Sequence, residues 1–283
     1  MTGFVTRFAP SPTGYLHRGH AFSALTAYEA AREAGGRFLL RLEDIDRTRC
    51  RPEFEAAIDE DLAWLGLDWE RPVRRQSDHM ADYGAALRDL AERGLVYRCF
   101  KTRREVAEAI EAAPHGAMEA YVGAALPPAE EAARVAAGEP YAWRLSLAAA
   151  ERALGGFGAL AFVEEGGGPA GETGLIAARP QLGGDVVLAR KDVGVAYHLA
   201  VVHDDALQGV THVIRGQDLF EAAHVQRLLQ ALLGYPAPVY RHHRLLAGAD
   251  GKRLAKRDRA ETLRELRARG MTPQGLRSEL GFG

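Results

Sequence analysis

The sequence predicts an α/β protein in which helices cover a doubly wound parallel sheet and an α+β insertion separates the two halves of that sheet. Strand, helix and strand patterns follow one another over residues 4–42, as in a parallel right-handed crossover. Further strand-like apolar runs occur before residue 100 and after residue 185, whereas the stretch between them is rich in Ala, Gly and Pro. We therefore expect the two halves of one domain at 1–100 and 181–247, the insertion at 101–180, and a loop with short helices at 248–283.

Proline and glycine mark the ends of the elements in the first unit. Residues 4–8 form an apolar strand pattern, and Pro10 and Pro12 in the following turn exclude a helix there. Apolar residues then recur at helical spacing from close to His17 until the pair of glycines at 35–36. The run RFLLRL at 37–42 predicts a second strand, which ends in an acidic cluster.

The later elements follow the same rules. Helices are expected at 52–66 and 79–94, and a strand in LVYRCF. The insertion is expected to contain short helices and a hairpin near EEGGGPAGE. After it, the runs DVVLAR, VAYHLAVVHDD and THVIRG predict strands, and a helix is expected at 219–233.

The composition is that of a soluble globular protein. Of its 283 residues, 47% are hydrophobic and 26% are charged, which excludes a disordered or low-complexity chain. The formal net charge of -2 gives no general attraction to nucleic acid. Only two cysteines are present, which suits a reducing compartment, and no signal peptide or membrane-length apolar run is evident. We expect a cytoplasmic protein that does not contact membranes.

Two histidines follow the first predicted strand. His17 and His20 are one helical turn apart, so both imidazoles can donate hydrogen bonds to a polyphosphate beside the start of a helix. Taken alone, such a pair is more often two surface histidines, and a metal site is a further alternative. The preceding strand and turn, together with a glycine-flanked basic segment at 252–259, favour a nucleotide.

A second group of residues suits a small substrate that carries charges of both signs. Glu43 follows the second strand, where its carboxylate can pair with an ammonium group, while Arg7 and Arg215 end other strands and can bind carboxylates. Tyr197 adds a hydroxyl group. For each residue alone, a structural ion pair or hydrogen bond explains it equally well; their common position at strand ends favours a ligand site.

Three segments resemble the class I glutamyl- and glutaminyl-tRNA synthetases, in order along the chain. RFAPSPTGYLHRGH resembles the signature opening of these enzymes, and RLEDIDRTR and AYHLAVVHDDALQGVTHVIRGQDL resemble their next two blocks. The resemblance covers about 4–100 and 181–257, and it implies a Rossmann-like catalytic domain. The loop GKRLAKRD resembles the KMSKS-type loop of the family, with Arg253 and Ala255 in place of Lys and Ser.

The resemblance also implies roles for individual residues and for cofactors. ATP, accompanied by Mg²⁺, is the implied co-substrate, bound by the catalytic residues His17, His20 and Lys256. The implied glutamate pocket comprises Arg7, Phe8, Ala9, Pro10, Ser11, Glu43, Tyr197 and Arg215.

Within the family, the chain resembles the truncated glutamyl-queuosine tRNA(Asp) synthetases. Only about 26 residues follow Arg257, too few for an anticodon-binding domain, and Gln217 in RGQDL also resembles that group. The resemblance implies that L-glutamate is activated without tRNA and joined to the queuosine base at the wobble position of tRNA(Asp). We expect a monomer. The alternatives are a reduced glutamyl-tRNA synthetase that charges the 3′ end of tRNA(Glu), and a non-catalytic regulator that binds glutamate or nucleotide.

One feature of that group is incomplete in this sequence. Its members usually hold zinc in the insertion through a Cys-x-Cys pair, a Tyr and a last Cys. Here Cys99 and Tyr121 match, but Lys101 and Ala125 replace the other two ligands. His115 is the one nearby substitute, and a lone loop histidine is more often simply exposed. We expect no zinc, with the insertion held by its own packing.

Overall fold

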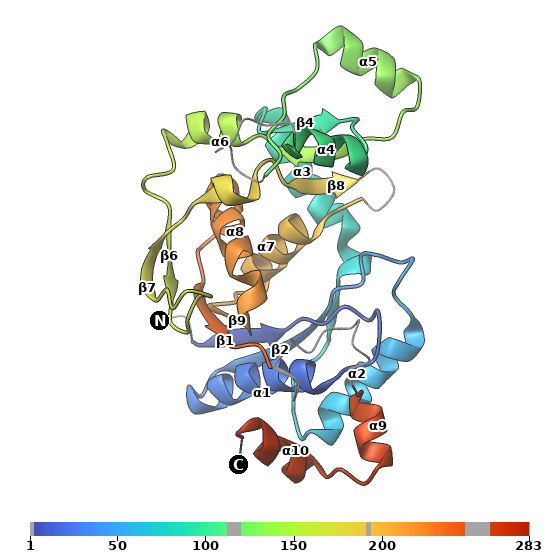
Figure 1. Ribbon diagram of the computed structural model, residues 1–283, viewed down its shortest axis with the longest axis vertical. Coiled ribbons are helices and arrows are strands. Elements are labelled where there is room, and N and C mark those ends of the chain that lie inside the picture. The colour runs from blue at the N-terminus through green and yellow to red at the C-terminus, as the bar shows by residue number, and fades with distance from the viewer. Residues whose placement is uncertain (1–2, 112–119, 191–193, 247–260, 283) are drawn as a thin grey trace.

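The computed structural model describes residues 3–111, 120–190, 194–246 and 261–282 (Figure 1). The strands are β1 (Val5–Phe8), β2 (Arg37–Leu42), β3 (Arg74–Arg75), β4 (Val96–Cys99), β5 (Ala142–Leu145), β6 (Ala161–Glu164), β7 (Gly174–Ala177), β8 (Val187–Arg190), β9 (His212–Gly216) and β10 (Val239–His243). The α-helices are α1 (Arg18–Glu33), α2 (Pro52–Trp64), α3 (Met80–Glu92), α4 (Arg103–Glu111), α5 (Pro128–Ala136), α6 (Leu147–Leu154), α7 (Tyr197–Leu207), α8 (Phe220–Leu233), α9 (Leu263–Ala268) and α10 (Pro273–Leu280).

Parallel strands form the centre of the molecule. β1 pairs with β2, and β2 with β3, all parallel. β9 lies on the other side of β1, where the backbone N–H of Thr211 donates to the carbonyl of Val5 at 2.9 Å, and β10 and β6 continue the parallel order beyond β9. The chain thus adds strands outward in both directions from β1 and β9. This reversal of order is the switch point of a doubly wound sheet, and it confirms the predicted fold class.

Helices cover both faces of this sheet, as Figure 1 shows for α1 below β1 and β2, with α7 and α8 above them. The side chains of β2 alternate accordingly. Leu39 belongs to the core between the sheet and helices α7 and α8, whereas Phe38 and Leu40 belong to the core between the sheet and α1. Strands buried on both faces give continuous apolar runs, which is why RFLLRL was a reliable strand signal.

Strand pairing crosses the predicted domain boundaries. β4 and β8, assigned to the two halves of the main domain, both pair antiparallel with β5 of the insertion. The predicted glycine-rich hairpin is confirmed as β6 and β7, but β6 also pairs with β10 and so extends the sheet of the second half. The division at residues 100 and 180 remains a prediction.

One predicted strand is wrong. The run VAYHLAVVHDD forms the helix α7, not a strand. Its residues Leu199 to Val202 are all buried, because the helix packs against neighbours on several sides. A helix buried on several sides gives the same unbroken apolar run as a buried strand, and the pair of valines favoured the strand interpretation.

The helical course of α7 places two acidic side chains against the strands. Asp205 accepts hydrogen bonds from Arg7 of β1 at 3.0 Å and from the fully buried Arg41 of β2 at 2.7 Å. Asp204 accepts from Arg74 of β3 at 2.7 Å and also from Tyr83 and Gln76, and it lies 3.7 Å from Nε of Arg41. Burial tends to raise the pKa of Asp205, but Arg7 and Arg41 outweigh it and hold that pKa below its usual value. We call these five charged residues, Arg7, Arg41, Arg74, Asp204 and Asp205, the α7 ion network.

Loss of Asp204 is expected to destabilise the fold strongly. Its side chain is fully buried, and the Asp204→Ala variant would leave the guanidinium of Arg74 without its closest carboxylate. We expect the free energy of unfolding in urea to fall by about 3–5 kcal/mol. The matched control is Asp89→Ala, which removes an exposed pair with Arg93 and is expected to change that free energy by less than about 1 kcal/mol. Equal effects of the two variants would contradict a structural role for the network.

Candidate active site

The predicted site residues lie where the parallel strands end, at the same end of the sheet. Arg7 is near the end of β1, and Phe8 to Ser11 lead into the following turn. Glu43 comes directly after β2, and Arg215 is near the end of β9. Tyr197 is the first residue of α7. The structure therefore places Arg7, Glu43 and Arg215 at the carboxyl ends of strands on both sides of the switch point, the usual ligand position in this fold class, and Tyr197 lies beside Arg215.

The turn after β1 is tied to the acid after β2. The hydroxyl of Ser11 donates to the carbonyl of Glu43 at 2.6 Å, and the backbone N–H of Glu43 donates to the carbonyl of Pro10 at 3.0 Å. These two hydrogen bonds hold residues 10–11 and Glu43 in a fixed relation. A substrate contacted by the turn would therefore also meet the Glu43 carboxylate.

Arg7 belongs to the α7 ion network, and Glu43 contacts it through Arg41. Arg41 lies 3.2 Å from Glu43, and Arg7 meets Asp205 through Nε at 3.0 Å and Nη2 at 3.3 Å. Burial raises the pKa of Glu43, although Arg41 and Arg7 act against this. Counting Glu43, three carboxylates face three guanidinium groups, so the positive charge of Arg7 is already matched by the protein.

Arg215 has a different environment. The residue is 5% exposed. Its guanidinium donates to Nε2 of His242 at 3.0 Å, to Oε1 of Gln226 at 2.8 Å, to the carbonyl of Leu219 at 2.9 Å and to the hydroxyl of Tyr197 at 3.4 Å. None of these acceptors is a carboxylate, and within the described ranges Arg215 forms no ion pair. A buried charge without a counter-ion is costly, so this position suits the carboxylate of a ligand.

The histidines beside Arg215 do not add charge at neutral pH. Burial, and secondarily the charge of Arg215, lowers the pKa of His198 to about 4. Burial also lowers the pKa of His242, with a smaller opposing effect from Glu164. The guanidinium of Arg215 is therefore surrounded by neutral groups.

His17 and His20 together cap the start of α1. Nδ1 of His17 accepts from the backbone N–H of Gly19 at 3.1 Å, and Nδ1 of His20 accepts from the backbone N–H of His17 at 3.2 Å. Because both Nδ1 atoms accept, each neutral ring carries its proton on Nε2. The two rings lie 3.9 Å apart between centroids, so both donors belong to one cluster at the helix N-terminus.

Lys256 and the rest of the KMSKS-type loop lie outside the described residues. The chain after this loop is described from Glu261, and Thr262 forms a β-bridge with His17. The backbone N–H of Leu263 also donates to the carbonyl of Leu16 at 2.8 Å. The segment that follows the loop thus begins beside the two histidines.

Sequence reasoning missed several residues of this site. Asp205 was seen only as part of an apolar run, and the buried acceptors of Arg215, which are Gln226 and His242, were not considered. Glu164, which contacts His242, was placed in the insertion. Acidic or amide residues inside apolar runs were the available signal, because such residues are buried only when they have partners.

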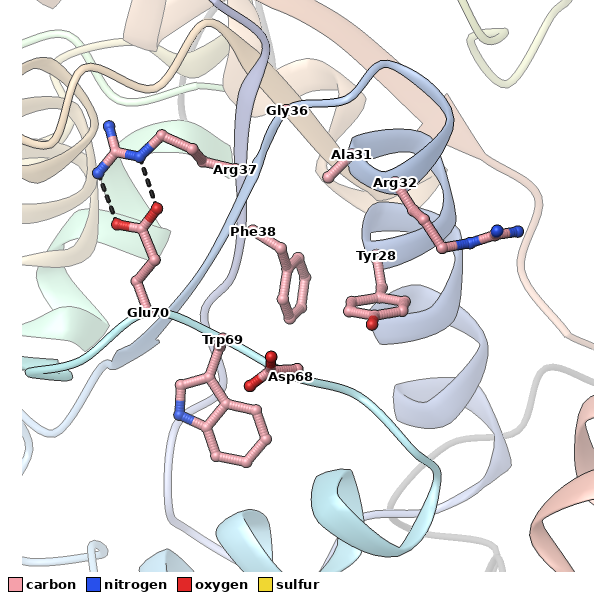
Figure 2. Close-up of a pocket in the computed structure, with 9 residues that line it drawn as sticks. All are labelled: Tyr28, Ala31, Arg32, Gly36, Arg37, Phe38, Asp68, Trp69 and Glu70. Carbon is pink, nitrogen blue, oxygen red and sulfur yellow. Dashed lines mark hydrogen bonds and ion pairs between the residues drawn. The ribbon is translucent and has the colours of Figure 1, made fainter.

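A hollow lies at the opposite ends of the strands (Figure 2). It measures about 320 Å³ and is formed around Gly36, Arg37 and Phe38 at the start of β2, with Trp69 and Glu70 opposite. Figure 2 shows the guanidinium of Arg37 paired with the carboxylate of Glu70, at 2.6 Å for both bonds. This position at the amino ends of the strands separates the hollow from the predicted site residues.

The two remaining zinc-ligand positions are adjacent but incomplete. Sγ of Cys99 lies 3.9 Å from the hydroxyl of Tyr121, and among the described residues no three His, Cys, Asp or Glu side chains are grouped as metal ligands. His115 lies outside the described residues. Cys99 with Tyr121 supplies only half of a tetrahedral zinc site, so the donor set does not fit the metal.

Asp185 connects the segments around this position. Its carboxylate accepts from the hydroxyl of Tyr97 at 2.8 Å, from the backbone N–H of Gly123 at 2.9 Å and from that of Leu147 at 2.9 Å. Its own backbone N–H donates to the carbonyl of Tyr121 at 2.7 Å. These contacts join β4, the 121–123 segment and α6 through protein groups alone.

The absence of zinc remains a prediction that metal analysis can test. We expect much less than one zinc per chain in the purified protein, because two of four ligands are replaced. The double variant Lys101→Cys with Ala125→Cys restores the ligand set and is expected to bind about one zinc per chain. Stoichiometric zinc in the unmodified protein would contradict the prediction.

No helix in the described part of the chain is long and apolar enough to cross a membrane.

The chain is similar to known tRNA synthetases. Residues 4–156 and 171–281 match the model of the class I tRNA synthetases (E and Q), catalytic domain. The chain is 48% identical over 288 residues to a glutamyl-Q tRNA(Asp) synthetase of Rhodobacter capsulatus, covering 98% of this chain and 100% of that protein. It is 38% identical to a glutamate–tRNA ligase of Aquifex aeolicus and covers 56% of it.

Among solved structures, a glutamate–tRNA synthetase of Elizabethkingia anophelis is similar to this chain. The TM-score is 0.75 at 28% sequence identity, and the similarity covers 90% of this chain. The chain spans about half, 53%, of the length of that solved protein.

Proposed function

Because this chain belongs to the class I glutamyl- and glutaminyl-tRNA synthetases, we propose that it activates glutamate with ATP and transfers it to the queuosine base at the wobble position of tRNA(Asp). The observation that carries the activation step is the buried Arg215, whose partners among the described residues are all neutral. The choice of acceptor is supported by the printed name of the Rhodobacter relative, which matches along its whole length.

The site offers complementary charges for glutamate. The guanidinium of Arg215 and the hydroxyl of Tyr197 would bind one substrate carboxylate, which would supply the counter-ion that Arg215 lacks. Glu43 would accept the substrate ammonium group. Arg7 would act from within the α7 ion network, together with the turn at residues 8–11.

ATP would lie at the N-terminus of α1. The Nε2 protons of His17 and His20, the backbone N–H groups of the helix and the ammonium of Lys256 would face its phosphates. Class I synthetases generally use ATP with Mg²⁺, which offsets negative charge on the triphosphate. Among the described residues no group of three or more His, Cys, Asp or Glu side chains could hold a metal ion, so the ion would be bound mainly by the nucleotide itself.

Two transfer steps follow from these positions. A carboxylate oxygen of glutamate attacks the α-phosphorus of ATP in line, and pyrophosphate leaves as the acyl–phosphate bond of glutamyl-adenylate forms. A hydroxyl of queuosine then attacks the activated carbonyl, AMP leaves, and the hydroxyl proton passes to solvent or to the departing phosphate. The residues of the chain bind and orient the reactants; none is assigned as a general base.

The second candidate is charging of tRNA(Glu), which the similarity to the Aquifex ligase favours. In that case the acceptor would be the 3′-terminal ribose instead of the queuosine base. The same activation site would serve both reactions, so only the acceptor distinguishes them.

We also propose that the enzyme works in the cytoplasm, where its two free cysteines, Cys50 and Cys99, would stay reduced. The monomeric state remains a prediction.

An acceptor assay tests the proposed function. We expect glutamate-dependent exchange of pyrophosphate into ATP without tRNA, and transfer of labelled glutamate to tRNA(Asp) that contains queuosine. Matched tRNA(Asp) with guanosine at the wobble position is expected to accept less than about a hundredth as much, because it lacks the attacking hydroxyl. tRNA(Glu) serves as the control for the second candidate.

Each contrary result has a distinct meaning. Transfer that persists on tRNA(Asp) without queuosine, or that prefers tRNA(Glu), would contradict the proposed acceptor. A lack of exchange at saturating glutamate and ATP would contradict activation itself and favour a non-catalytic binding protein.

A further inference from the structure

Three buried side chains form a series of hydrogen bonds from β6 to Arg215. Oε2 of Glu164 lies 2.5 Å from Nδ1 of His242, and Nε2 of the same imidazole lies 3.0 Å from Nε of Arg215. The exposed fractions of the three residues are 1%, 2% and 5%. His242 and Arg215 are register partners on β10 and β9, so the sheet itself sets their separation.

Arg215 fixes which atoms donate and which accept in this series of hydrogen bonds. Nε of an arginine always carries a proton, so Nε2 of His242 must accept from Arg215. The single ring proton of the neutral imidazole then lies on Nδ1 and is donated to Glu164. Burial, which lowers the pKa of His242, is consistent with this neutral form.

Glu164 is itself held in place by the backbone. Its Oε1 accepts from the backbone N–H groups of His242 at 2.8 Å and Gly166 at 2.9 Å. A side chain at position 166 would bring a Cβ within 2.2 Å of the carbonyl of His242, so only glycine permits this close approach. The carboxylate therefore has a fixed position, with one oxygen for the backbone and the other for the imidazole.

We infer that Glu164 and His242 are positioning residues that orient the Arg215 guanidinium for the substrate carboxylate. This inference rests on the proposed function, in which Arg215 binds glutamate. With Nε held by His242, Nη1 of Arg215 is directed toward Tyr197 and Gln226, and Nη2 toward the carbonyl of Leu219. Glu164 acts on Arg215 through His242 and does not contact it directly. Its carboxylate therefore does not occupy the edge of the guanidinium that a substrate would use.

The variant Glu164→Gln tests the direction of the hydrogen bonds. Its amide oxygen can still accept from the backbone, which leaves the amide N–H₂ facing Nδ1 of His242. The proton of the imidazole must then lie on Nε2. Two N–H donors, Nε2 of His242 and Nε of Arg215, would face each other, and the hydrogen bond between them would be lost. In tRNA-free pyrophosphate exchange we expect the KM for glutamate to rise at least about tenfold and the KM for ATP to stay within about twofold.

Two further variants separate positioning from general stability. His242→Leu removes the acceptor for Arg215 and is expected to raise the glutamate KM as Glu164→Gln does, whereas His242→Gln offers an amide oxygen to Arg215 and is expected to recover most of the loss. The matched control is Glu165→Gln, at the next residue, which affects only an exposed pair with Arg241 and is expected to match the unmodified enzyme. Equal increases in both KM values, or no change in the glutamate KM, would overturn the inference.

The tautomer of His242 gives a readout that does not require activity. In ¹⁵N-histidine-labelled protein, NMR is expected to show a protonated Nδ1 and an unprotonated Nε2, with the two exchanged in Glu164→Gln. A protonated Nε2 in the unmodified protein would overturn the inference whatever the exchange assay shows. Absence of glutamate-dependent exchange in the unmodified protein, with the expected tautomer present, would instead contradict the proposed function alone.

Discussion

The ion pairs between α7 and the strands are the interaction on which the rest of the structure depends. Asp204 and Asp205, adjacent on one helix, meet arginines from β1, β2 and β3, and so fix α7 against the sheet at the switch point. The same helix carries Tyr197 at its N-terminus, beside Arg215. Five charges that are largely shielded from water would destabilise the fold if they were unmatched, so their mutual geometry restricts where the helix can lie.

Charge balance distinguishes the structural arginines from the one that suits a ligand. Arg7 and Arg41 both face carboxylates of the protein, whereas Arg215 meets only neutral acceptors in the part of the chain that the structure describes. A substrate carboxylate at Arg215 would complete the pairing that the protein leaves open. If Arg215 binds the side-chain carboxylate of the substrate, a neutral amino acid would leave the buried guanidinium without a counter-ion, and an acidic one would be preferred.

The sequence predicted most of the fold and the place of the candidate site residues at strand ends, but not the contacts that organise them. β1, α1 and β2 followed directly from periodicity and from the proline and glycine signals. α7 did not, since a helix buried on several sides lacks amphipathic spacing and its apolar run resembles a strand. Arg7, Glu43 and Arg215 were found because they stand at strand ends. Asp205 contacts Arg7, and Glu164 reaches Arg215 through His242, only in the tertiary fold, at separations along the chain that no local pattern reports.

A structure of the protein bound to glutamate tests the central claim most directly, since that claim concerns where a carboxylate meets a guanidinium. We predict a carboxylate oxygen of glutamate within about 3 Å of an Nη atom of Arg215, with the Arg7–Asp205 pair intact. Glutamate bound with no carboxylate contact to Arg215, or held by Arg7 after displacement of Asp205, would contradict the account.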